Sequence, residues 1–357
     1  MRDFKFALLA LIAWGAAFSS AAQDGGDRIG FHGSEIPEGI WSENGIDYQI
    51  IDSDAHKVMV FDLIGKGWDK WGYTEPVNIP ESVMHDGVLY EVTRIAKGTF
   101  NHSVEVVLPS SISVIESDCF NSFGYDTQEK VSFNFPSELQ EIESNCFNST
   151  RLNEIKLPGS LKKIEDNCFC LNENLTSLEF GKNIRKIGAD SFSGNENLKE
   201  IILPNSLALV GEGAFCDNAA LEKVKLPRYL AFEYGAYQLT DMKIFNDCPN
   251  IKLIEWESEF PAAMPQSFNA VNKGECTVIV PDGCRERYLG NEYWKLFNIV
   301  EKSAYQVSVE GVAVAESDRD KEYFSLSGLK ISSKECLGKG SVYILKTPKG
   351  SSRMMNY

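Results

Sequence analysis

The chain has 357 residues, of which 35 are basic and 51 acidic, and its net charge is −16. Apolar residues make up 43% of the chain and charged residues 24%, which is typical of globular proteins and excludes a largely disordered chain or a fibre. The basic residues form no dense tract, so a nucleic-acid-binding surface is not expected.

The N-terminal segment has the layout of a secretory signal peptide. Arg2 and Lys5 precede an uncharged apolar run over residues 6–18, and the small residues Ser20, Ala21 and Ala22 follow it. This run is too short for a membrane-spanning helix, which needs about 20 residues. The pattern predicts that residues 1–22 are removed before Gln23, and that the protein is exported to the cell surface, the extracellular space or the periplasm. No later stretch is apolar for long enough to predict a transmembrane segment.

The middle of the chain repeats with a period of 20 to 30 residues. The period is marked by a phenylalanine at positions Phe100, Phe120, Phe147, Phe169, Phe192, Phe215, Phe245 and Phe268. The first six are preceded, five residues earlier, by Ile95, Ile115, Ile142, Ile164, Ile187 and Val210. Such periods indicate a solenoid, in which each unit is too small to form a core by itself.

The unit that ends at Phe169 shows how one coil is built. Ile155 and Leu157 alternate with polar residues, which predicts a short half-buried strand, and Pro158 ends that strand. Leu161 and Ile164 return the chain to the core, with no regular structure expected between them. Stacking about eight such coils would bury a continuous apolar interior.

Two positions beside each phenylalanine form further ladders. The residue before it is small in most units, and the residue after it is most often Asn, which favours turns. Cys119, Cys146 and Cys168 share the small position on successive coils. Their side chains are expected to run parallel, so buried free thiols are predicted rather than disulfides or a zinc site.

The unit L-x-x-I-x-L-P-x-x-L-x-x-I-x-x-x-x-F resembles the BspA-type, or treponemal-type, leucine-rich repeat. The segments 77–95 and 280–301 resemble the usual entry and exit of such arrays, so the resemblance covers about residues 45–301. It implies a mainly β leucine-rich repeat solenoid of short strands with irregular returns. Family members are typically secreted or surface proteins of bacteria and some protists, and are often implicated in adhesion.

Four segments are predicted. Residues 1–22 form the signal peptide, 23–92 an N-terminal β cap, 93–301 the solenoid and 302–357 a small C-terminal antiparallel β-domain. Within the cap, 45–51 and 57–63 alternate like hairpin strands. The C-terminal segment resembles the sorting-type β-domains of secreted Bacteroidetes proteins, and a plain β module without a sorting role is the alternative.

The sequence carries no motif for catalysis. It has four histidines, none in a zinc-protease or triad-like setting, and no phosphate-binding glycine loop. The prediction is therefore a protein that is not an enzyme, with no cofactor, no metal and no catalytic residue. Two alternatives stay open: a structural envelope protein without a dedicated ligand, and a carbohydrate-binding or carbohydrate-active protein.

The leading hypothesis is an adhesin-like protein that binds a protein or glycan partner at the cell surface, and two regions are candidates for contact. The first combines a basic cluster on the strand face with aromatic residues in a long irregular coil: Lys223, Lys225, Arg228, Tyr229, Tyr234 and Tyr237. The second is an aromatic loop with Trp68, Trp71 and Tyr73. Tyr and Arg often anchor interfaces, but these aromatic residues could also pack within their own loop or within the cap.

Overall fold

The computed structural model describes the repeat region and several flanking strands. The described residues are 40–62, 68–69, 72–73, 76–100, 105–124, 132–232, 243–260, 264–306, 322–325, 330–331, 342–347 and 350–355. The predicted signal peptide lies outside these residues, and so do Trp71, Tyr234 and Tyr237.

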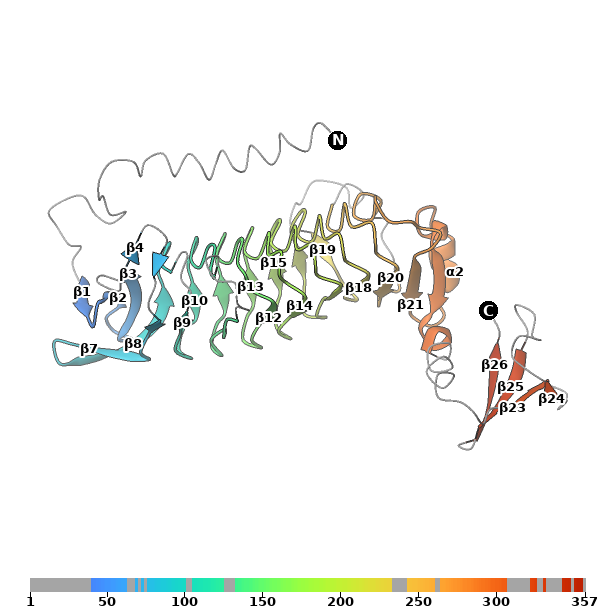
Figure 1. Cartoon of the computed structure of the whole chain (residues 1–357), viewed down its shortest axis with the longest axis horizontal. Coiled ribbons are helices and arrows are strands. Elements are labelled where there is room, and N and C mark those ends of the chain that lie inside the picture. Colours follow the sequence, from blue (N-terminus) through green and yellow to red (C-terminus); the bar gives the residue numbers. More distant parts are fainter. Residues whose placement is uncertain are drawn as a thin grey trace.

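The coils stack along one long axis (Figure 1), and two ladders of short strands run along the stack. The front ladder contains the strands that the period-two pattern predicts. Its members pair in parallel. β6 pairs with β9, β12 pairs with β14, and β16, β18, β20, β21 and β22 form one five-stranded sheet in that order. The strands are β6 (Val77–Asn78), β9 (Val106–Val107), β12 (Glu154–Lys156), β14 (Ser177–Glu179), β16 (Glu200–Ile202), β18 (Lys223–Leu226), β20 (Leu253–Trp256), β21 (Thr277–Val280) and β22 (Asn298–Glu301).

The return side of each coil also forms strands, so the expectation of an irregular return is wrong. The repeated Ile and Val positions lie in two-residue strands that pair in parallel from coil to coil. Two residues are too few to show a period-two pattern, which is why the sequence does not reveal them. The strands are β10 (Val114–Ile115), β11 (Glu141–Ile142), β13 (Lys163–Ile164), β15 (Lys186–Ile187), β17 (Leu209–Val210) and β19 (Ala231–Phe232).

The return ladder continues into the strands that precede the repeats. β2 (Ile46–Asp52) pairs antiparallel with β1 (Ile40–Glu43) and β3 (Lys57–Asp62), which confirms the two predicted hairpin strands. β8 (Val88–Ile95) joins β3 to β10 by parallel pairing and forms a hairpin with β7 (Ser82–His85). The turns of the β1–β2 and β7–β8 hairpins are Asn-Gly and Asp-Gly pairs with positive φ at both residues, the backbone that two-residue hairpins prefer.

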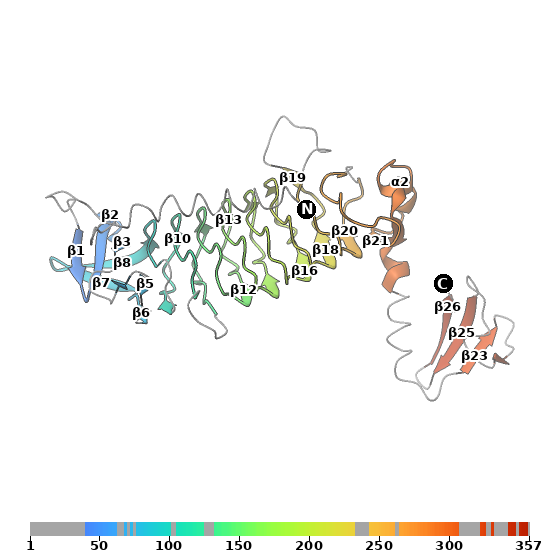
Figure 2. The same ribbon diagram turned by 45° about the horizontal axis from the view of Figure 1, so that its top comes forward.

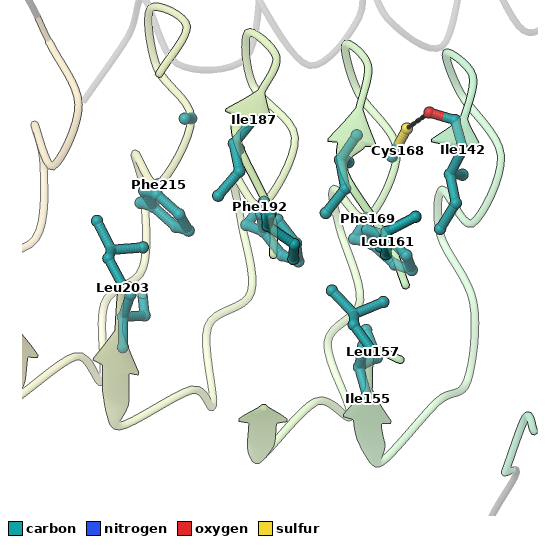
Figure 3. Close-up of a cluster of buried hydrophobic side chains, with 14 of the residues drawn as sticks. Ile142, Ile155, Leu157, Leu161, Cys168, Phe169, Ile187, Phe192, Leu203 and Phe215 are labelled. Atoms are coloured by element: carbon teal, nitrogen blue, oxygen red, sulfur yellow. Dashed lines mark hydrogen bonds between the residues drawn. The ribbon is translucent and has the colours of Figure 1, made fainter. Parts of the chain in front are cut away.

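The phenylalanines form a stacked column through the core, as the repeat predicts. All eight side chains are fully buried, and the ring centroids of successive members lie 5.0 to 5.5 Å apart with interplanar angles of 2 to 17°. Figure 3 shows three successive members, Phe169, Phe192 and Phe215, together with the aliphatic side chains that surround them.

A left-handed backbone position recurs two residues before the phenylalanine in successive coils. Asp118, Asn145, Asn167 and Asp190 occupy it with φ between 51 and 62°, and Gly98 and Gly213 take the same place in other coils. Asn and Asp tolerate this conformation better than other non-glycine residues. Glycine occurs at Gly181 for a different reason. It takes the place of the repeat proline, and a Cβ there would lie 2.1 Å from the carbonyl oxygen of Pro158.

The cysteine ladder is confirmed as a column of buried free thiols. Cys119, Cys146 and Cys168 donate to the carbonyl oxygens of Ala96, Glu116 and Glu143 on the preceding coil, at 3.0, 3.0 and 2.9 Å. Cys168 also reaches the carbonyl oxygen of Ile142 at 3.7 Å (Figure 3). Burial raises the pKa of all three thiols well above the ordinary value.

A buried asparagine ladder lies three residues after the phenylalanine, not directly after it. Asn172, Asn195 and Asn218 are fully buried, and each side-chain amide donates to the carbonyl oxygen of the phenylalanine in its own coil and in the coil before. The predicted position, directly after the phenylalanine, is only half-buried at Asn121 and Asn148. The ladder spans three coils, so it is a weaker sequence signal than the phenylalanine column.

The last coils are followed by two short helices, α2 (Arg285–Leu289) and η3 (Trp294–Leu296), which contribute the buried Tyr288 and Trp294. Further along, β24 (Lys330–Ile331), β23 (Glu322–Ser325), β25 (Val342–Thr347) and β26 (Gly350–Met355) form an antiparallel sheet in that order, as the alternating C-terminal pattern predicts. The division of the chain into cap, solenoid and C-terminal domain stays a prediction.

Candidate interaction surface

The outer side of the front ladder carries rows of charged side chains that pair between neighbouring coils. Lys156 lies 3.1 Å from Glu179, and Lys223 lies 2.5 Å from Glu200. Opposite charges placed directly across a ladder in this way stabilise the pairing. The ammonium group of Lys223, part of the predicted basic cluster, is therefore engaged by a carboxylate of its own chain.

The other two cations of that cluster are also paired. Lys225 lies 3.2 Å from Glu255 and 3.1 Å from Glu257, and Arg228 forms an ion pair with Glu259. The three carboxylates stand at alternate positions along β20 and its extension. The predicted basic cluster is therefore not a free positive patch, because carboxylates of the two neighbouring coils pair with all three of its cations.

The pairing shifts the titration of both partners. Burial opposes ionisation of Glu257, but hydrogen bonds from Lys225 and Asn205 outweigh it and lower the pKa of that carboxyl. Burial likewise opposes the charge of Lys225, yet Glu257 and Glu255 raise its pKa. Both groups are therefore charged near neutral pH.

A hollow of about 260 Å³ lies beside these charges. Its apolar lining includes Trp256, Ile279 and Pro281. Ile279 of β21 is in register with Glu255 on one side and Val300 on the other. The hollow forms because this coil presents short apolar side chains where the neighbouring coil presents long glutamates.

Lys302 lines the hollow as well and forms ion pairs with two of its glutamates. It follows β22, and its Nζ lies 3.4 Å from a carboxylate oxygen of Glu255 and 3.5 Å from one of Glu257. These are the longer contacts of the cluster, since Lys225 holds the same two carboxylates at 3.1 to 3.2 Å.

Two exposed aromatic rings flank the ion pairs. Tyr229 is 75% exposed, and the guanidinium carbon of Arg228 lies 5.4 Å from its ring centroid. Phe260 is 73% exposed, and Arg287 of α2 lies over its ring at 4.4 Å. Because Leu226 is in register with Trp256, these two rings belong to equivalent turns on adjacent coils.

Hydrogen bonds from three side chains hold the loop that carries Phe260. The ring nitrogen of Trp256 donates to the carbonyl oxygen of Pro227 at 3.1 Å, and the hydroxyl of Tyr288 donates to that of Ser258 at 2.8 Å. Arg287 donates to the carbonyl oxygen of Glu259 at 2.7 Å. Sequence reasoning missed Phe260, although an aromatic residue next to alternating glutamates was the available signal.

The structure does not test whether the remaining predicted contact residues take part in this surface. Tyr234, Tyr237 and Trp71 lie outside the described residues, and so do the side chains of Trp68 and Tyr73. The backbones of Trp68 and Tyr73 pair in the short hairpin of β4 (Trp68–Asp69) and β5 (Gly72–Tyr73). Figures 1 and 2 place this hairpin near one end of the stack and β20 and β21 near the other.

Within the described ranges, no group of three His, Cys, Asp or Glu residues is arranged to hold a metal ion. The same part of the chain contains no helix long and apolar enough to cross a membrane.

A family model for the BspA type leucine rich repeat region matches residues 122–241 in six copies. Residues 122–241 therefore carry BspA-type leucine-rich repeats. A leucine-rich repeat protein from Bacteroides ovatus ATCC 8483 is 16% identical and has a TM-score of 0.37, with 73% of this chain and 81% of that chain covered. A leucine-rich repeat protein of T. pallidum is 20% identical, with a TM-score of 0.37 and coverage of 71% and 96%.

The pneumococcal vaccine antigen PcpA is 16% identical to this chain, with a TM-score of 0.33 and coverage of 74% of this chain and 98% of that chain. No curated protein sequence matches the chain. Leucine-rich repeat proteins mediate protein interactions and are typically not enzymes.

Proposed function

We propose that this BspA-type protein is exported and binds a protein partner at the cell surface without catalysing a reaction. The hollow beside Glu255, Glu257 and Lys302, with the exposed rings of Tyr229 and Phe260, is the proposed contact surface. The observation that carries the proposal is the exposure of two large aromatic side chains on adjacent coils, each beside an arginine. Aromatic and arginine side chains around a pocket are the usual composition of interface hot spots.

The segments outside the array fit an exported repeat protein. We propose that residues 23–92 cover the first coil and that 302–357 form a separate C-terminal β-domain, with the signal peptide removed before Gln23. Terminal coils need such covers for their apolar faces. N-terminal sequencing of protein from the envelope fraction tests export: a first residue at or within a few positions of Gln23 supports it, and an intact Met1 contradicts it.

The test of the binding surface begins with a pull-down by the mature protein from surface-exposed proteins of candidate target cells. Tyr229→Ala combined with Phe260→Ala should weaken a retained partner at least about tenfold, since hot-spot truncations cost 2 kcal/mol or more. The matched control is Met84→Ala with Leu89→Ala, which removes two side chains that are 55% and 56% exposed on the β7–β8 hairpin.

Equal losses for the two double variants, with unchanged circular dichroism, would place the contact elsewhere. The aromatic hairpin at Trp68–Tyr73 is then the next region to test. Alanine at Lys223 and Lys225 is a poorer probe than the sequence alone suggests, because it also removes the ion-pair partner of Glu200 and one of the two partners of Glu255.

A further inference from the structure

Two carboxylates at the hollow make longer contacts with one of their two lysine partners than with the other. Glu255 and Glu257 are each shared between Lys225 and Lys302, and the contacts to Lys302 are the longer ones. The side chain of Lys302 is 43% exposed. Exposed ion pairs contribute little net free energy, so another cation can replace the Lys302 ammonium at small cost.

The shape of the hollow suits one long side chain rather than a cofactor. Its volume of about 260 Å³ lies below the usual range of pockets for drug-sized ligands, about 300–1,000 Å³. Its lining combines apolar groups of Ile279 and Pro281 with the carboxylates of Glu255 and Glu257. A side chain with an aliphatic stem and a cationic head matches both parts.

The neighbouring rings distinguish between the two cationic side chains. Tyr229 and Phe260 already lie beside the guanidinium groups of Arg228 and Arg287, yet both rings remain about three-quarters exposed. The surface is therefore built to stack guanidinium groups and has ring area left. Arginine stacks on aromatic rings and pairs with carboxylates through two parallel hydrogen bonds, which lysine cannot do.

The charge of the whole chain points in the same direction. The net charge is −16, and Lys223, Lys225 and Arg228, the cations of the predicted basic cluster, are paired with carboxylates of the chain itself. A strongly acidic protein attracts basic partners and repels acidic ones at a distance. The basic cluster therefore does not favour an acidic partner, although its three cations alone would suggest one.

We infer that the hollow binds an arginine side chain from a basic segment of a partner protein. The incoming guanidinium displaces the Lys302 ammonium from Glu255 and Glu257, and further arginines of the segment stack on the free area of Tyr229 and Phe260. The inference rests on the proposed binding function and specifies its partner chemistry. Lys302 is then an internal competitor that occupies the site when no partner is bound.

Fluorescence anisotropy with a labelled nona-arginine peptide tests the inference on the full mature protein at about 150 mM salt, where long-range attraction is largely screened. Nona-arginine should bind at least about threefold more tightly than nona-lysine, and nona-glutamate should not bind. Glu255→Gln with Glu257→Gln should weaken nona-arginine about tenfold or more. The matched control, Glu154→Gln with Glu179→Gln, removes the same charge from exposed positions of the same strand face and should change affinity less than about threefold.

The Lys302→Met variant should change the affinity for nona-arginine in the opposite direction. Removing the competitor should tighten nona-arginine binding by about three- to tenfold, whereas Lys156→Met, which frees Glu179 in the same way, should change it less than about twofold. Weaker or unchanged binding in Lys302→Met, or equal losses in the two glutamate variants, would overturn the inference. If a pulled-down partner still depends on Tyr229 and Phe260 in that case, the binding surface stands and only its proposed preference for arginine fails.

Discussion

Asn195 tests how much of the stability of the array comes from buried polar groups rather than from the phenylalanine column. Its side-chain oxygen accepts from the backbone N–H of Asn172 at 2.9 Å. Its side-chain nitrogen donates to the carbonyl oxygens of Phe169 and Phe192 at 3.1 and 2.9 Å. The residue is fully buried, so these three bonds hold its own coil and the coil before it together in a region from which water is excluded.

Replacing Asn195 with Ala removes all three hydrogen bonds and leaves the buried N–H of Asn172 without a partner, while the carbonyl oxygens of Phe169 and Phe192 each keep one amide donor, from Asn172 and Asn218. A typical net contribution is about 0.5–1.5 kcal/mol per bond, and a buried group left unsatisfied costs about 1–3 kcal/mol. Two lost bonds and one unsatisfied N–H, reduced for partial relaxation of the coils, should lower the free energy of unfolding by about 2–5 kcal/mol. Asn195→Asp should be at least as harmful, because a carboxylate oxygen would face two carbonyl oxygens.

Urea unfolding followed by far-ultraviolet circular dichroism measures the change. The control is Asn197→Ala, which removes one exposed hydrogen bond to the carbonyl oxygen of Glu173 and should cost less than about 1 kcal/mol. If Asn195→Ala and Asn197→Ala destabilise the protein equally, the buried ladder does not hold the coils together as argued.

Three further predictions follow from the core and the ion pairs. Phe169→Ala should lower the free energy of unfolding by about 3–5 kcal/mol, with the exposed Phe260→Ala as control, and a loss below about 1 kcal/mol would contradict the stacked register. The eight cysteines of the described residues are buried and should resist alkylation in the native protein and react in urea, since burial raises the pKa of the Cys119, Cys146 and Cys168 thiols. Fast labelling of any of these eight in the native protein would contradict the burial. Burial opposes ionisation of Glu165, but Lys163 and Lys186 hold its pKa below the ordinary 4.5. The ion pairs of Glu165 therefore stabilise the folded protein above pH 4.5, and this stabilisation is lost as the pH falls through the lowered pKa. Glu165→Gln should make stability less dependent on pH in that acidic range, and an unchanged profile in acid unfolding would contradict the pairing.

The sequence by itself determined the elements that depend on short-range pattern and on repetition. Phe169 and its equivalents recur in register, so one interpretation of a single unit applies to every coil, and stacking follows because one unit cannot bury its apolar side chains alone. The front strands and the parallel free thiols follow from the same register. The Asn-Gly and Asp-Gly pairs likewise determine their hairpins locally.

The tertiary structure alone decided which groups meet across coils. The two-residue return strands exist because their hydrogen-bond partners lie one coil away, and no pattern within a single coil indicates them. The side chain of Asn195 can be buried because the preceding coil presents an N–H and a carbonyl group to it. For the same reason, only the structure shows that the cations of the basic cluster, Lys223, Lys225 and Arg228, are paired with carboxylates. Glutamates 30 residues or so away in sequence stand one coil away in space, and the pairing of charges depends on distance in space rather than on distance along the chain.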